Sequence, residues 1–266
     1  MAKRALEHVR RMRGGAQAHL LRCDDAAYYV TKFQNNPQHL RILANEMLGA
    51  RLADALGLPV ARAEVVEVRA DLVERTPELA VHRRGKWEKC VPGFQFGSRF
   101  PGELGRAVVF DLMPDERLSD VENAADFAGM VLFDQWTCNT NGRQVLFVGE
   151  PHRRRGYRAM MIDQGFCFNA GEWSFPDSPL RGLYHRHKVY ASIRGWESFE
   201  PWLTRLEALS LRALDEAAAS VPPEWYNHDT EAMTRLLEQL ERRRQRIREL
   251  VTAAKNSTRQ PFPNWS

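Results

Sequence analysis

Two stretches of the sequence decide the fold. One is Phe133-Asp134-Gln135-Trp136-Thr137-Cys138-Asn139-Thr140-Asn141-Gly142-Arg143-Gln144, and the other is Met160-Met161-Ile162-Asp163-Gln164-Gly165-Phe166. The first runs from an apolar helical segment into a polar loop, and the second is an apolar strand that ends in a single carboxylate. An unpaired charge at the end of a buried strand is costly, so Asp163 is expected to have a metal or cation partner. An aspartate that merely begins a tight turn is the alternative.

The segments that surround these stretches predict helices around one hairpin. Residues 123–138 have apolar side chains at helical spacing, and residues 145–148 and 157–163 are typical of two paired strands. Residues 196–220 and 228–254 are expected to be helical, with Pro222 and Pro223 between them.

Towards the N-terminus the pattern changes to strands and one helix. Residues 8–32 predict a hairpin followed by a third strand, and residues 60–68 predict another strand. Residues 38–56 predict a helix that Gly57 and Pro59 end. Residues 70–105 have a weak, loop-rich pattern, and residues 107–110 predict a short strand.

This order predicts an α+β fold with two lobes. Residues 1–112 are expected to form a β-rich lobe and residues 113–266 a mainly helical lobe, with the boundary after the strand at 107–110. The regular alternation of strand and helix that a Rossmann sheet requires is missing.

Composition excludes several classes of protein. The four cysteines are scattered and form no CxxC pair, which argues against a structural zinc site or a disulfide framework. No stretch approaches the roughly 20 apolar residues of a membrane span, and the first residues lack the apolar segment of a signal peptide. We therefore expect a cytoplasmic protein with reduced thiols that does not bind a membrane.

Two arginine runs raise the question of nucleic acid. They are Arg153–Arg155, and Arg242–Arg244 with Arg246 and Arg248. Glutamates are interleaved with the second run, which is typical of a solvated helix face. With a net charge of only +4, nucleic-acid binding remains a minor hypothesis.

Several residues suit phosphate chemistry when they are taken in order. Gly14-Gly15 can bring backbone amides close to a phosphate, Lys32 can direct an ammonium group at it, and Glu46 can hold that lysine. Each has an ordinary alternative: a hairpin turn, an exposed strand lysine and a solvent-facing carboxylate.

The polar loop offers a second group of candidates. Asn139, Asn141, Arg143 and Gln144 carry amides that can ligate magnesium and a guanidinium that can neutralise developing phosphate charge. Taken alone, Asn141-Gly142 is more typical of an ordinary turn than of a site.

As an ordered set, these motifs resemble the HipA-like kinases, in particular short stand-alone bacterial members with a divergent protein-kinase fold. The resemblance rests on residues 10–20, Tyr29–Pro37, Asn45-Glu46 with Leu56–Pro59, Phe133–Gln144, and Ile162-Asp163, and it covers roughly residues 8–170.

The resemblance implies a role for each position. Gly14 and Gly15 would cover the phosphates of ATP, Lys32 would contact them, and Glu46 would pair with Lys32. Asp163 would bind Mg²⁺, and Gln144 is the nearest amide able to act as a second ligand.

The chain departs from the family where a catalytic aspartate is expected, because Asn141 stands there. An amide can orient a hydroxyl group but cannot accept its proton. Two functions therefore remain open. One is phosphoryl transfer from Mg-ATP to a protein Ser/Thr hydroxyl, with Asn141 and Arg143 at the reacting group, and the other is a nucleotide-binding pseudokinase that regulates or binds other proteins.

Overall fold

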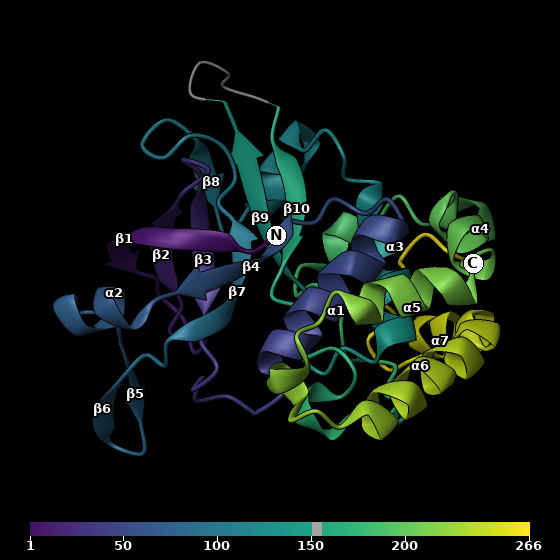
Figure 1. Ribbon diagram of the computed structural model, residues 1–266. Coiled ribbons are helices and arrows are strands. Elements are labelled where there is room, and N and C mark those ends of the chain that lie inside the picture. Colours follow the sequence, from purple (N-terminus) through teal and green to yellow (C-terminus); the bar gives the residue numbers. More distant parts are fainter. Residues whose placement is uncertain (151–155) are drawn as a thin grey trace.

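Five strands near the N-terminus close into a small barrel (Figure 1). The structure is a computed structural model, and it describes residues 1–150 and 156–266. The barrel strands, in the order in which they are hydrogen-bonded, are β1 (Lys3–Arg11), β2 (His19–Cys23), β3 (Tyr28–Lys32), β7 (Gly93–Arg99) and β4 (Ala63–Val68). Only β1 and β4 pair in parallel, through Lys3 and Arg4. The predicted hairpin is confirmed, and its strands enclose a small apolar core of their own.

The region expected to be loop-rich contains more regular structure than its pattern indicates. Between β4 and β7 lie the helix α2 (Ala70–Arg75) and a hairpin of β5 (Ala80–Arg83) and β6 (Lys86–Lys89). Strands of four residues, one of them fully exposed, have too few buried side chains to produce a detectable alternation. The hairpin touches the turn between β1 and β2, because the Gln17 side chain exchanges two hydrogen bonds with the backbone of His82.

Helix α1 (Ile42–Ala55) lies between the barrel and the helices of the second half (Figure 1). It contacts β4 and β7 on one side and α5 on another, and most of its residues are buried. It begins four residues later than predicted and ends as predicted. Gly57 adopts a φ of +70°, and its N–H and that of Leu58 bond the last carbonyls of the helix.

A three-stranded sheet follows the barrel. Its strands are β8 (Val108–Phe110), β9 (Gln144–Gly149) and β10 (Arg158–Ile162), in the order β10-β9-β8. Helix α3 (Asp126–Thr137) precedes β9, and the predicted hairpin of β9 and β10 is confirmed. Because β8 lies before residue 113 but pairs with β9, this sheet includes residues from both sides of the predicted boundary.

Short helices fill the rest of the second half. The α-helices are α4 (Trp202–Glu207), α5 (Leu211–Ala219), α6 (Thr230–Gln245) and α7 (Ile247–Lys255). The single-turn 3₁₀ helices are η1 (Asp115–Asp120), η2 (Ala170–Glu172), η3 (His187–Tyr190), η4 (Trp196–Phe199) and η5 (Pro223–Tyr226). The predicted helix over residues 196–220 is therefore broken, and a new helix begins where the Ser210 hydroxyl caps the N–H of Ala213.

The second arginine run belongs to this helical layer. Arg242, Arg244 and Arg246 pair with nearby glutamates, while the buried Arg243 pairs with Asp177. These pairs support the interpretation of the run as a helix surface. Residues 153–155 lie outside the described residues. In the part of the chain that the structure describes, none of the helices has the length and apolar character needed to span a membrane.

The packing of α3 yields a stability prediction. A Cβ on Gly129 would overlap the Trp202 ring and lie 2.7 Å from Leu58 Cδ2. Because both neighbours are buried, we expect Gly129→Ala to lower the free energy of unfolding by about 1–3 kcal/mol. Urea denaturation measures it, with Ala253→Ser as a control that adds one atom at an exposed helical position. An unchanged midpoint for Gly129→Ala would contradict this packing.

Candidate nucleotide site

Three segments that are far apart in the sequence meet at one ammonium group. Lys32, the last residue of β3, forms ion pairs with Glu46 on α1 and with Asp163, which directly follows β10. The lysine side chain is 8% exposed and the Glu46 side chain 3%, whereas the Asp163 side chain is 29% exposed. Asp163 is thus the member of the trio that can face a ligand.

The surroundings keep Lys32 charged. Burial alone would lower the pKa of its ammonium group, but the Asp163 and Glu46 carboxylates next to it raise that pKa above its ordinary value. A permanent cation between two carboxylates can transfer its hydrogen bonds to phosphate oxygens, because phosphate offers the same kind of anionic acceptor.

The Glu46 carboxylate holds backbone as well as lysine. It accepts hydrogen bonds of 2.9 Å from the N–H groups of Gln164 and Gly165. A Cβ on Gly165 would lie 2.8 Å from Glu46 Oε1 and 2.7 Å from Ile42 Cγ1, so only glycine permits this approach. Asp163 itself adopts a φ of +56°, which is uncommon for a residue with a side chain. The segment after β10 is therefore held in an unusual conformation by α1.

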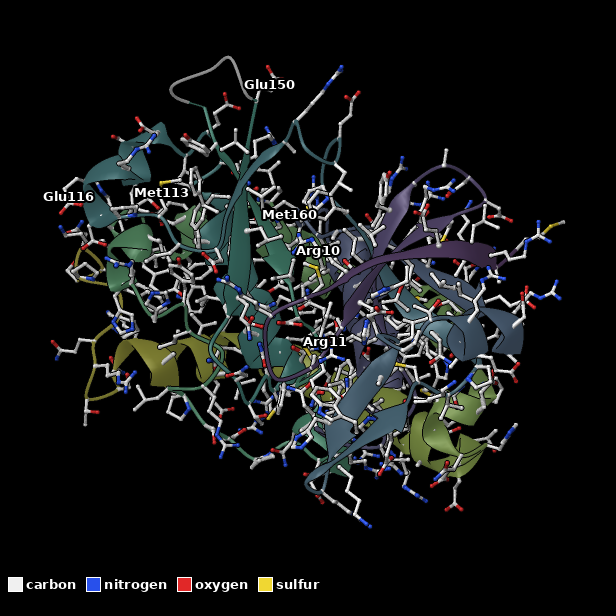
Figure 2. All side chains as sticks on the ribbon, turned by 90° about the vertical axis from the view of Figure 1, so that its left-hand side faces the viewer. Arg10, Arg11, Met113, Glu116, Glu150 and Met160 are labelled. Carbon is white, nitrogen blue, oxygen red and sulfur yellow. The ribbon has the colours of Figure 1, made fainter. Side chains whose placement is uncertain are left out.

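The glycine pair lies in the turn between β1 and β2. Gly14 has a φ of +114°, where a side chain would be strained, and no heavy atom lies within 4 Å of the place a Cβ would take. The turn is fixed on its far side, where Asn36 donates a hydrogen bond of 2.9 Å to the carbonyl of Ala16. Figure 2 shows Arg10 and Arg11 at the end of β1, where the strand enters this turn.

The polar loop after α3 is anchored at both ends. Cys138 ends the helix in a left-handed conformation, and the Asn139 side chain donates to Asp134 at 2.9 Å. Asn141 is partly exposed; its side-chain oxygen accepts from Gly142 N at 2.9 Å, and its carbonyl accepts from Gly182 N at 3.1 Å. This is the hydrogen bonding of a turn, with the side chain at its edge.

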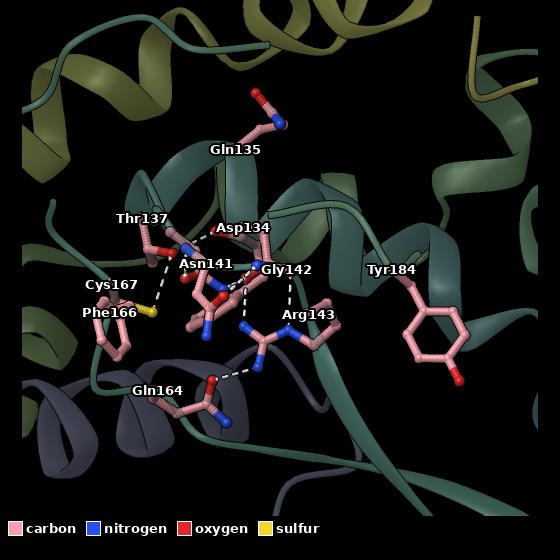
Figure 3. A network of polar contacts seen from close by, with 12 residues as sticks. Asp134, Gln135, Thr137, Asn141, Gly142, Arg143, Gln164, Phe166, Cys167 and Tyr184 are labelled. Atoms are coloured by element: carbon pink, nitrogen blue, oxygen red, sulfur yellow. Dashed lines mark hydrogen bonds and ion pairs between the residues drawn. The ribbon is translucent and has the colours of Figure 1, made fainter. Parts of the chain in front are cut away.

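Arg143 is placed differently from the sequence-based expectation. Its guanidinium is 1% exposed, pairs with Asp134 through two nitrogens, and donates to Ile162 O and Gln164 Oε1 at 2.9 and 2.7 Å (Figure 3). Burial alone would lower the pKa of this guanidinium, but the Asp134 carboxylate raises it, so the group stays charged. A group enclosed in this way cannot contact a phosphate. Arg143 instead connects α3 to the residues on either side of Asp163, and Asp134 supports the fold by neutralising this arginine.

Gln144 begins β9 and pairs with Ile162, the residue before Asp163. It is exposed, and because Val145 and Phe147 are buried, Gln144 and Leu146 point to the opposite face of the hairpin. No group of three or more His, Cys, Asp and Glu residues is arranged for a metal ion in the described residues. A single exposed carboxylate still suits Mg²⁺, which keeps several waters and completes its shell with substrate phosphates.

An apolar hollow lies further along the β9–β10 hairpin, against the segment that precedes β8. Its volume is about 470 Å³, and its lining includes Pro59, Gly102, Ala107, Val148 and Met160. Met160, labelled in Figure 2, is three residues from Asp163 along β10, a separation of about 10 Å. A larger hollow of about 680 Å³ lies between β1 and α2, and none of Lys32, Glu46 and Asp163 lines either hollow.

One family model matches more than half of the chain. The family model of HipA-like kinases matches residues 6–169, a span that contains the turn, the lysine trio and the polar loop. The chain belongs to the HipA-like kinase family. A comparison of the sequence with curated proteins finds no match.

Solved kinase structures share the fold. The proinflammatory kinase CtkA of Helicobacter pylori aligns with a TM-score of 0.57 at 13% identity, over 93% of this chain and 95% of that one. The Golgi casein kinase with Mn/ADP bound aligns with a TM-score of 0.51 at 12% identity, over 97% and 73%. HipA of Shewanella oneidensis, solved with HipB and operator DNA, aligns with a TM-score of 0.50 at 15% identity, over 95% and 68%. The predicted α+β kinase-like fold is confirmed.

With the fold known, one further position becomes informative. In protein kinases the loop H-R-D-x-x-x-x-N places a metal-binding asparagine five residues after the catalytic aspartate. Counted from Asn141, that position is Leu146, which cannot ligate a metal. The sequence contained this signal, but it becomes readable only when the loop and β9 are aligned without a gap.

The buried pair of Asp134 and Arg143 allows a direct test. Removing one partner leaves an uncompensated charge, so we expect Arg143→Met to cost about 3–5 kcal/mol of unfolding free energy. The double variant Asp134→Leu with Arg143→Met should recover most of that loss, because no buried charge remains. Urea denaturation measures both. Arg212→Met, which breaks an exposed pair with Glu216, is the control and should cost less than about 0.5 kcal/mol. A cost for Arg143→Met no larger than that of the control would contradict the assignment.

Proposed function

We propose that the chain binds ATP together with Mg²⁺ between the β-barrel and the β9–β10 hairpin. The observation that carries this proposal is the position of Lys32, whose ammonium group is held by Glu46 on one side and by the more exposed Asp163 on the other. In protein kinases a lysine–glutamate pair and a metal-binding aspartate must both be in place for nucleotide to bind productively. Family membership supports the same site.

Different residues around the trio would contact different parts of the ligand. Lys32 would donate to phosphate oxygens, and the backbone N–H groups at Gly14 and Gly15 would cover the phosphates from the barrel side. Asp163 would hold the Mg²⁺ ion, with the Gln144 amide as a further oxygen donor. Bound Mg²⁺ would neutralise part of the phosphate charge.

The nucleobase fits the apolar hollow near Met160. That hollow has about the volume a small flat ring system needs, and Val148 and Met160 offer apolar contacts to its faces. The span of about 10 Å from Met160 to Asp163 leaves room for a ribose between base and phosphates.

Phosphoryl transfer to a protein Ser/Thr hydroxyl is the reaction that such a site would serve. Asn141 would orient the acceptor hydroxyl but cannot take its proton, while transfer relies mainly on positioning and electrostatics. We propose a Ser or Thr side chain of a protein as the acceptor of the phosphoryl group.

A nucleotide-binding pseudokinase is the second candidate, and two residues favour it. Asn141 replaces the carboxylate that would act as base, and Leu146 occupies the position of the second metal ligand. The site would then bind Mg-ATP through Lys32 and Asp163, and the occupied cleft would present a surface to other proteins.

Nucleotide binding is tested by thermal shift and calorimetry with ATP and Mg²⁺. A ligand at 100 times its Kd stabilises the folded state by about 2.7 kcal/mol, so we expect a clear rise in melting temperature. Asp163→Asn, which keeps the shape of the side chain, should remove the gain that Mg²⁺ adds. Lys32→Met should weaken binding with or without the metal. Lys188→Met, at an exposed lysine paired with Asp115, is the control. If ATP fails to stabilise the native chain, the proposed site is wrong.

Turnover separates the two candidates. In a radiolabelled-ATP assay, we expect little transfer by the native chain, and at least about 100-fold more by the double variant Asn141→Asp with Leu146→Asn, because a general base commonly contributes that much. Adding Asp163→Ala to the double variant should abolish the gained activity. Rapid transfer by the native chain would exclude the pseudokinase.

A further inference from the structure

Adjacent residues of α1 hold the segment after β10 from opposite sides. Glu46 accepts hydrogen bonds from the N–H groups of Gln164 and Gly165, as described above. Asn45 donates hydrogen bonds to carbonyl groups of the same segment. The Asn45 side-chain nitrogen donates to Gly165 O and Cys167 O at 2.9 Å each and to Ala170 O at 2.7 Å. Its oxygen accepts from Trp173 Nε1 at 2.7 Å. One fully buried amide thus joins four residues of the segment to α1.

The segment that Asn45 holds would not keep its shape unaided. Phe168, Asn169 and Ala170 are three consecutive residues with left-handed backbones, with φ of 59°, 56° and 57°. None of them is glycine, so each of these conformations is unfavourable in an unconstrained chain. Asn45 bonds the carbonyl just before this strained stretch, at Cys167, and the carbonyl of its last residue, Ala170.

Other contacts strengthen the same connection. His39, just before α1, is bonded through Nε2 to Gly165 O at 2.8 Å and packs against the Phe166 ring. On the far side, the N–H groups of Phe168 and Asn169 bond the carbonyls of Thr137 and Cys138 at the end of α3. The segment is therefore bonded to both helices that border the nucleotide site.

In protein kinases, movement of the helix that carries the glutamate and ordering of the loop after the metal-binding aspartate control activity. Here, both elements are joined by buried hydrogen bonds between side chains of α1 and the backbone of the segment. We propose that Asn45 is a positioning residue that locks residues 163–173 to α1, so that the nucleotide site is assembled without an activating step. The inference rests on the proposed function, since the site that is assembled is the one proposed for Mg-ATP.

Amide hydrogen exchange tests the lock without any nucleotide. In the native chain, the N–H groups of Gln164, Gly165, Phe168 and Ala170 should exchange slowly. In Asn45→Ala they should exchange at least about tenfold faster, because the lost donor leaves the carbonyls of Cys167 and Ala170 unsatisfied, while Gly165 O keeps its bond to His39. Trp173→Phe removes the bond that orients the Asn45 amide and keeps a smaller ring against Arg41 and Tyr226, and it should give a smaller change of the same sign if Asn45→Ala fails to fold. Unchanged exchange in a folded Asn45→Ala, or in Trp173→Phe where Asn45→Ala does not fold, would overturn the proposal.

The metal dependence of nucleotide binding gives a second readout. The quantity compared is the ratio of the ATP Kd in EDTA to the ATP Kd in Mg²⁺, which reports on Asp163. We expect this ratio to fall at least about tenfold in Asn45→Ala, while the Kd in EDTA changes little, because the barrel and the apolar hollow remain intact.

Gln95→Ala is the matched control. Gln95 is also a fully buried amide, and it bonds the N–H of Gln34 and the carbonyl of Val91 inside the barrel. It should lower stability and leave the Kd ratio unchanged. If both variants lower the ratio equally, Asn45 has no specific positioning role. If the native chain binds no ATP, the proposed function fails, whereas native binding with an unchanged ratio in Asn45→Ala overturns this inference alone.

Discussion

A buried ammonium group between two carboxylates organises this molecule. Lys32 comes from the barrel, Glu46 from α1 and Asp163 from the end of β10, so a single cation ties together three parts that share no local sequence. A buried charge without partners would be costly, and each of the three elements therefore constrains the others.

In the other half of the molecule, a second buried ion pair also joins segments that are apart in the sequence. Arg143 and Asp134 join the polar loop to α3, and the same guanidinium reaches the backbone before Asp163 and the side chain after it. The two networks meet at Gln164, whose side chain bonds Arg143 and whose N–H bonds Glu46. Gln164, the residue next to Asp163, is thus fixed from both sides.

The sequence allowed the trio to be predicted, because the expected strand, helix and strand end carry Lys32, Glu46 and Asp163 in the order in which the kinase family has its lysine, glutamate and metal-binding aspartate. It could not determine which way Arg143 points, since spacing along a loop says nothing about burial, and the guanidinium lies inside rather than at a phosphate. The role of Asn45 could not be predicted for a related reason. The apolar spacing of α1 shows which residues are buried among apolar neighbours, but not that a buried amide will meet three carbonyls from a segment 120 residues away. The ion pair of Lys32 and Glu46 is confirmed, whereas the roles of Lys32 and Asp163 toward a ligand, like those of Gly14, Gly15, Gln144 and Asn141, remain predictions.

The barrel is connected to the rest of the chain at three places. Because α1 packs into the large core and β8 pairs with β9, the connections are residues 33–41, 56–62 and 100–107. A body attached at three points cannot swing away as it could about a single hinge; it can only rock through a small angle. Entry and release of a ligand would then be governed by the amplitude of that rocking, which makes slow exchange of a bound nucleotide a natural property of this architecture.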